Sequence, residues 1–330
     1  MNPKMNVKIG PALSAVPHSS VRTEGEHPGA TGDIVVAGDA GAMVTDVEGE
    51  AKEGFLTAAL RGRSIFGLLG MMVVLAWIVI VIIGPAISPH TNGAMVSPDV
   101  FANASRAFPL GTDYLGRDVL SRILYGARYT VGLALSAAVL ASVLGTCFGL
   151  FAALSQRWID EALSRFFDAL ISIPSKILAL VVIAAFGSSL NMLICIAALA
   201  YVPGAYRISR SLAVNVMTLE YVQVARARGE GILYIAVREV LPNMIHPMLA
   251  DFGLRFVFIV LLLSGLSFLG LGVQPPNADW GSMVRENMDG LSQGAPAVIV
   301  PALAIASLTI GVNLLIDNLR RKGGRSHGGA

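Results

Sequence analysis

The charged side chains that interrupt long apolar runs are the residues of this sequence with the clearest chemistry. Lys176 follows Pro174 by two residues near the middle of one such run, and Asp251 and Arg255 lie four residues apart in another. A charge in apolar surroundings is costly, so it usually faces a cavity or pairs with an opposite charge. The spacing predicts a same-face ion pair for Asp251 and Arg255. Two hypotheses stay open for Lys176: contact with an anionic group of a bound small molecule, or pairing with an acidic residue of a partner chain.

Residue sets for catalysis or metal binding do not occur at the spacings that such chemistry needs. The sequence has no G-x-x-x-x-G-K-[ST] motif, so this chain cannot cradle nucleotide phosphates itself. His90 and His246 stand beside prolines at the ends of apolar runs, and Cys147 and Cys195 lie inside such runs. A structural zinc site needs about four ligands at close spacing. We therefore predict no catalytic residue, no bound cofactor and no metal site on this chain.

The composition indicates that lipid surrounds much of the chain. Of the 330 residues, 54% are hydrophobic and 14% are charged, whereas a soluble domain carries about 25% charged residues. The net charge of +2, without a basic stripe interleaved with aromatic residues, excludes nucleic acid as a partner. Membrane lipid is the expected neighbour instead.

Six apolar runs are long enough to cross a bilayer, which takes about 20 residues of helix. They predict an all-α integral membrane protein whose membrane domain covers residues 61–319. Residues 1–60 are rich in Gly, Ala, Pro and acidic residues and show no sustained period, so we expect a disordered tail there, and residues 320–330 form a second tail. The predicted spans lie near 65–87, 129–154, 165–186, 190–209, 248–272 and 297–317.

Basic residues gather in the joints on one side of these spans, which predicts that both chain termini are cytoplasmic. Thirteen lie on the predicted inner side and five on the outer side. The inner set is Arg61, Arg63, Arg157, Arg165, Arg207, Arg210, Arg226, Arg228, Arg238, Arg320, Arg321, Lys322 and Arg325, and the outer set is Arg106, Arg117, Arg122, Arg128 and Arg285.

The longest inner joint, residues 210–247, predicts a compact bent element. Residues 211–228 have helical spacing, Gly229 and Gly231 interrupt it, and a second short helix follows that Pro242 is expected to end. Two short amphipathic helices joined at a glycine suit insertion into a groove of a cytosolic partner. Helices lying flat on the lipid surface are the alternative.

Two outer segments also stand out. The stretch from Gly270 to Pro276 cannot continue as regular helix, which favours a bend that gates the outer mouth of the membrane domain. The candidate gate residues are Gly270, Gly272, Pro275 and Pro276. The acidic segment from Asp113 to Asp118 is expected to be a surface element.

Three motifs resemble one transporter family. Ala225-Arg226-Ala227-Arg228-Gly229, followed by Leu241-Pro242, resembles the signature loop of ABC-importer permeases: Glu-Ala-Ala, three residues, Gly, nine residues, Ile, any residue, Leu-Pro. Gln223 and Val224 depart from its Glu-Ala positions, and Glu239 from its Ile. The segments 109–122 and 267–276 are similar to parts of the C-type subunits of the dipeptide/oligopeptide/nickel permease branch.

The resemblance implies a type I ABC-importer permease fold in the bacterial inner membrane and a set of partners. These are a second permease subunit, two cytosolic ATPases that hold ATP and Mg, and a periplasmic or other extracytoplasmic solute-binding protein. Peptides lead among the solutes, while nickel complexes, glutathione, opines and oligosaccharides stay open. A channel or secondary carrier is the rival interpretation. The residues expected to couple to the ATPases are Ala225, Arg226, Arg228, Gly229, Glu230, Leu241 and Pro242. Lys176 is the candidate for the translocation pathway, facing an anionic solute group such as a peptide carboxylate.

Overall fold

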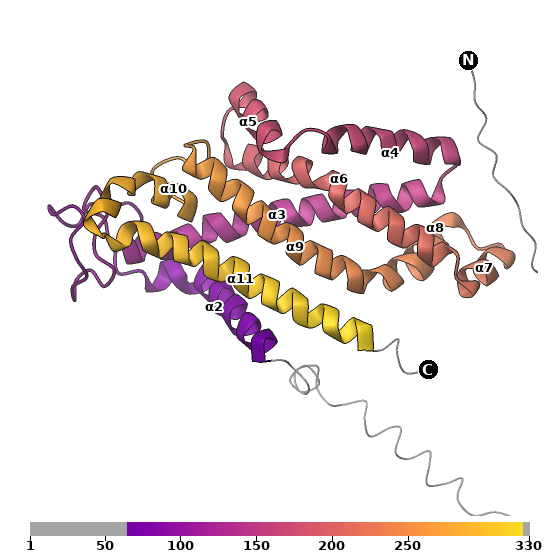
Figure 1. The fold of residues 1–330 in the computed structure, drawn as a ribbon, viewed down its shortest axis with the longest axis horizontal. Coiled ribbons are helices and arrows are strands. Elements are labelled where there is room, and N and C mark those ends of the chain that lie inside the picture. Colours follow the sequence, from indigo (N-terminus) through magenta and orange to yellow (C-terminus); the bar gives the residue numbers. More distant parts are fainter. Residues whose placement is uncertain (1–64, 326–330) are drawn as a thin grey trace, which may run out of the picture. The chain divides into compact units, whose positions relative to one another are not determined.

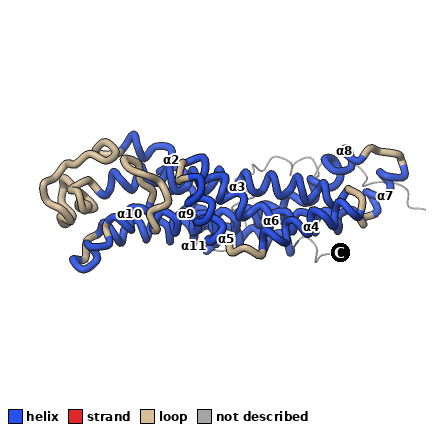
Figure 2. The backbone as a smooth tube through the Cα atoms, turned by 90° about the horizontal axis from the view of Figure 1, so that it is seen from above, coloured by secondary structure: helices blue, strands red, loops and turns tan. Residues whose placement is uncertain are grey.

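The computed structural model describes residues 65–325, and within that range the chain consists of helices and loops (Figures 1 and 2). Residues 1–64, which include the predicted disordered tail 1–60 and the start of the predicted membrane domain, and 326–330 lie outside the described residues. The elements in chain order are α2 (Ile65–Ile87), α3 (Val119–Leu154), α4 (Arg157–Ile171), α5 (Ser175–Phe186), α6 (Leu190–Met217), α7 (Glu220–Ala227), α8 (Ile232–Tyr234), the π-helix η2 (Ile235–Val240), α9 (Leu241–Phe268), α10 (Trp280–Glu286), the 3-10 helix η3 (Met288–Gln293) and α11 (Pro296–Arg325).

Within residues 65–325, five stretches of helix are long and apolar enough to cross a membrane, and a sixth crossing exists if α4 and α5 count as one broken span. This confirms the all-α membrane fold with about six transmembrane helices. The predicted span 165–186 is not one straight helix, because α4 and α5 meet at 83°. Pro174 at their junction has no N–H to donate and disfavours helical geometry at Ile173.

Several helices extend beyond the predicted spans. Helix α3 begins ten residues before the predicted 129, because the Asp118 side chain caps it by accepting the N–H groups of Leu120 and Ser121. Helix α6 continues past 209 to Met217, and α11 continues through Arg325, into the segment predicted as a tail. Helix α9 ends at Phe268 rather than at 272.

Pro242 does not end a helix, so that prediction is wrong. It lies in the first turn of α9, and the helix runs through it. The π-helical turn η2 leads directly into α9, and residues 232–268 form one continuous helical stretch.

Small residues let the central helices pack closely. A Cβ added at Gly145 of α3 would lie 2.2 Å from the Cβ of Ala205 in α6, and one at Gly149 would lie 2.8 Å from the backbone nitrogen of Arg210. Helices α2 and α11 make a similar contact at Gly70 and Gly311. Such contacts fix helix pairs where burial from water cannot, because lipid is as apolar as the side chains.

Candidate functional site

The loop between α6 and α9, residues 218–240 and called the α7 loop below, forms one end of the helix bundle (Figure 1). Helix α7 closes in a Schellman motif. The Gly229 N–H donates to the Arg226 carbonyl at 2.9 Å, and the Glu230 N–H donates to the Ala225 carbonyl at 3.2 Å. This motif needs a left-handed residue, and Gly229 supplies it with φ +81°. The bend predicted at Gly229 is therefore a defined helix end.

One side of the α7 loop is buried against the bundle. Val222 and Ala225 are fully buried and pack with Ala213 of α6 and with Val240 and Met244. Ala225, predicted as a coupling residue, is therefore a packing residue whose side chain faces inward. This apolar cluster ties the loop to α6 and α9.

The opposite side of the α7 loop exposes apolar and basic side chains together. Arg226 and Arg228 are exposed, as is Pro242, whereas Glu230 and Leu241 are half-buried. The sequence analysis did not identify most of these exposed apolar residues. Helical period could have found those in α7, because residues between the inward-facing Val222 and Ala225 must point outward. The exposed large apolar residues are Leu219, Tyr221, Val224, Ile232, Leu233, Tyr234 and Val237.

Lys176 lies in the first turn of α5, directly after the α4–α5 bend. The predicted third span is thus bent just before Lys176, which does not lie inside one straight helix. Its side chain is exposed in this chain, and it forms no ion pair within residues 65–325.

The segment between α9 and α10, residues 269–279, is folded tightly. Gly270 is left-handed, with φ +85°, and a Cβ on Gly272 would lie 1.7 Å from the Ser267 hydroxyl oxygen. The Gln274 side-chain amide donates to the carbonyls of Gly270 and Gly272, at 3.2 and 3.0 Å. Pro275 and Pro276 complete the segment. All four candidate gate residues lie in or beside one compact turn.

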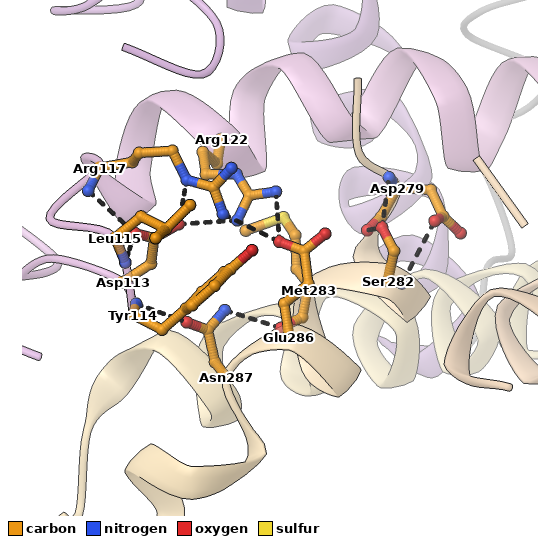
Figure 3. Close-up of polar contacts among 10 residues, drawn as sticks. All are labelled: Asp113, Tyr114, Leu115, Arg117, Arg122, Asp279, Ser282, Met283, Glu286 and Asn287. Atoms are coloured by element: carbon orange, nitrogen blue, oxygen red, sulfur yellow. Dashed lines mark hydrogen bonds and ion pairs between the residues drawn. The ribbon is translucent and has the colours of Figure 1, made fainter. Parts of the chain in front are cut away.

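A buried ion network lies at the end of the bundle opposite the α7 loop (Figure 3). Arg117 and Arg122 both bond one Asp113 oxygen, at 2.6 and 2.8 Å, and both bond one Glu286 oxygen, at 2.9 Å. These side chains are at most 8% exposed, so the expectation of a surface element at 113–118 is wrong. Despite the burial of its guanidinium, the neighbouring carboxylates raise the pKa of Arg117.

Helix α10 is held at both ends. At its start, Asp279 accepts the Ser282 N–H at 3.2 Å, and the fully buried Trp280 donates to the Ile123 carbonyl of α3 at 3.2 Å. At its end, Asn287 accepts the Tyr114 N–H at 3.1 Å. Burial raises the pKa of the Asp279 carboxyl, because the charged form loses its water.

Comparison with known proteins identifies the family of this chain. Residues 145–323 match the family described as the binding-protein-dependent transport system inner membrane component. The chain belongs to this family. The matched range holds the α7 loop, the Lys176 bend and helix α10, so this permease carries its candidate sites inside the shared domain.

Individual relatives are similar in sequence to this permease over most of its length. A putative peptide transport system permease protein of Brucella suis is 35% identical, over 74% of this chain and 84% of the relative. A dipeptide transport system permease protein of Alkalihalophilus pseudofirmus is 31% identical, over 77% and 83%. A glutathione transport system permease protein of Pectobacterium atrosepticum is 33% identical, over 66% and 72%. The chain is thus a multi-pass permease subunit of an ABC importer.

The predicted pair in α9 is present in the permease. Arg255 forms an ion pair with Asp251 one turn away and also donates to the Tyr201 carbonyl of α6, at 2.6 Å. The Arg255 side chain is 5% exposed, and its bond to the Tyr201 carbonyl ties α9 to α6.

Proposed function

We propose that this permease and a second permease subunit form the pathway for peptides or similar small solutes, and that ATP is hydrolysed on two separate cytosolic subunits. A solute-binding protein delivers the solute on the other side of the inner membrane. The names of the relatives favour peptides. The α7 end and both termini are assigned to the cytoplasm, since basic residues concentrate there. ATP and Mg belong to the partner ATPases.

The observation that carries the proposal is the exposed side of the α7 loop. Its apolar side chains stand beside Arg226 and Arg228 on a short helix that is anchored from behind. An anchored helix with an apolar outer face fits a groove of a partner, and arginines at the rim suit its carboxylates and carbonyls. Leu241 and Pro242 start α9 behind this surface, so they position the loop.

The pathway and the gate follow from the same proposal. Lys176 faces the pathway and meets an anionic group of the solute. Residues 269–276, with Gly270, Gly272, Pro275 and Pro276, form the outer gate. Closure of the ATPases moves the α7 loop, and rigid-body rocking of the helices changes access to the pathway.

The test uses a matched pair of glycine variants in the tagged permease. Gly229→Ala forces a Cβ into the left-handed region, which costs about 1–2 kcal/mol locally. Gly231→Ala is the control, because Gly231 has φ −70° and open space around its Cβ position. Each permease is purified from membranes in mild detergent, and the co-purifying ATPase subunits and their ATP hydrolysis are measured.

We expect the native chain and Gly231→Ala to retain a second permease and the ATPases, and Gly229→Ala to lose ATPase binding several-fold. Arg226→Glu/Arg228→Glu tests the rim charges without straining the backbone and should give the same loss. Retention of the ATPases by both variants would contradict docking at this loop and favour a lipid-bound loop. A native chain that purifies alone would favour a channel or carrier.

A further inference from the structure

Helices α4 and α6 are joined by polar contacts on three successive turns, called the α4–α6 ladder below. The Asp160 carboxylate accepts two hydrogen bonds from the Arg210 guanidinium. One turn along α4, the Ser164 and Tyr206 hydroxyl oxygens are 2.8 Å apart. Residues four apart share a helix face, so each of these contacts lies on the same side of α4. The third contact joins Asp168 to Arg207, at 2.8 Å.

The polar contacts of the ladder, each called a rung below, differ in how strongly they hold α4 and α6 together. Asp168 and Arg207 are 53% and 58% exposed, so their pair contributes little on its own. Asp160 and Arg210 are 21% and 35% exposed and bond through both carboxylate oxygens, a geometry that fixes orientation. Between the rungs, the Phe167 ring stacks on Tyr206 at 4.3 Å, and both are almost fully buried. The Asp160–Arg210 rung therefore holds α4 in register on α6.

Helix α6 also packs tightly on α3 and continues toward the α7 loop. Gly145 and Gly149 of α3 leave no room for a Cβ against α6. After α6 ends at Met217, two residues lead into α7, whose buried side packs on α6 through Ala213 and Val222. These contacts join the α7 loop to α6 and, through the ladder, to α4.

Helix α5 links this body to the candidate gate. It leaves α4 at 83° after Pro174. Its Ala179 and Ile183 are buried in the core beside α6, and Figure 1 shows α4 lying along α6. Just beyond α5, the Ser188 hydroxyl lies 3.4 Å from the side-chain nitrogen of Gln274, which belongs to the 269–279 segment. The bent pair α4–α5 thus reaches from the α7 end to the segment that holds Gly270 and Gly272.

We propose that the α4–α6 ladder makes α4 and α5 a lever, which carries the displacement of the α7 loop to the outer gate, with Asp160 and Arg210 as its positioning residues. This inference rests on the proposed function. Loss of the Asp160–Arg210 contact leaves ATPase docking intact, because neither residue belongs to the exposed side of the α7 loop. It uncouples ATP hydrolysis from the movement of α5.

The experiment uses the complete transporter, with both permeases, the ATPases and the binding protein, reconstituted in liposomes with a dipeptide as the transported probe. The variants are Asp160→Arg, Arg210→Asp and the double exchange, which restores the opposite charges. The control is Glu161→Arg, because Glu161 is 60% exposed on α4 and its ion pair within the described residues runs along the same helix, to Arg157. Dipeptide uptake, ATP hydrolysis and thermal unfolding are measured on each complex.

Each single variant should lower the dipeptide transported per ATP hydrolysed by about tenfold, within the range of coupling between sites. The double exchange should recover this ratio to within about threefold, and Glu161→Arg should leave it unchanged. A purely structural role would lower the amount or the melting temperature of the complex without changing the ratio. If complexes that carry the charge-reversal variants fail to assemble, Asp160→Asn is measured in their place.

An unchanged ratio in Asp160→Asn and the single variants would overturn the lever while leaving the proposed function standing. The lever would also be overturned if the double exchange restores the melting temperature of the complex but not the dipeptide transported per ATP hydrolysed. The proposed function would still stand. Failure of the native chain to retain ATPases would overturn both proposals, and this outcome is seen before any variant is compared.

Discussion

Glu286 offers a sharp test of the buried network, because one of its carboxylate oxygens serves two arginines. That oxygen lies 2.9 Å from nitrogens of Arg117 and Arg122, and the Glu286 side chain is 8% exposed. In the native network two guanidinium charges face two carboxylates, Glu286 and Asp113. Glu286→Gln keeps the shape and one acceptor oxygen but leaves one positive charge without compensation.

The magnitude follows from the burial of these groups. Removing one partner of a buried ion pair costs about 3–5 kcal/mol, because the remaining charge is left without water or a counter-charge. The matched control is Asp289→Asn, which removes a negative charge three residues along the chain. Asp289 is exposed and lies in η3, so we expect this change to alter stability by no more than about 0.5 kcal/mol.

The assay is equilibrium unfolding of the purified permease in mixed micelles, followed by tryptophan fluorescence. Trp280 is fully buried in the same short helix as Glu286, so its share of the emission is sensitive to this region. We expect Glu286→Gln to lower the free energy of unfolding by about 3 kcal/mol or more. A loss below about 1 kcal/mol, or a loss equal to that of Asp289→Asn, would refute the conclusion that the network is buried and mutually dependent.

Two further predictions concern single side chains. Since burial raises the pKa of the Asp279 carboxyl, the folded protein binds this proton more tightly than the unfolded chain. The resulting stabilisation is present below the unfolded pKa of about 4 and is lost as the pH rises toward the folded value. Unfolding from pH 4 to 8 should show wild type losing stability relative to Asp279→Asn, and a flat difference would contradict this. Lys176→Met should lower dipeptide uptake at least about tenfold at unchanged expression, as expected for a lost charge-assisted contact. Unchanged uptake would instead favour pairing with an acidic residue of the second permease or no role at all.

Much of the architecture follows from local sequence alone. A run of about 20 apolar residues has no stable alternative to helix in a bilayer, which is why the ranges 65–87 and 297–317 lie within α2 and α11. The break at Gly229 was predictable for a similar reason, since glycine favours the left-handed residue that ends a helix. The Asp251–Arg255 pair needed only helical spacing.

Contacts between distant segments could not be predicted in this way. Asp113 and Glu286 have the composition of exposed loop residues, and only the docking of α10 on the start of α3 buries them around two arginines. The same limit applies to Asp160 and Arg210, which are 50 residues apart. Helical period says which residues share a face, but not which other helix covers that face.

Pro174 and Pro242 illustrate the same distinction between what the local sequence determines and what tertiary packing determines. Proline removes one N–H donor in both cases, and the sequence carries that information fully. At Pro174 the chain turns by 83°, whereas at Pro242 it continues from η2 into α9. Whether the chain bends sharply at a proline or continues as helix through it depends on the packing of the flanking turns. That packing is a property of the folded bundle, because the residues that provide it come from other helices.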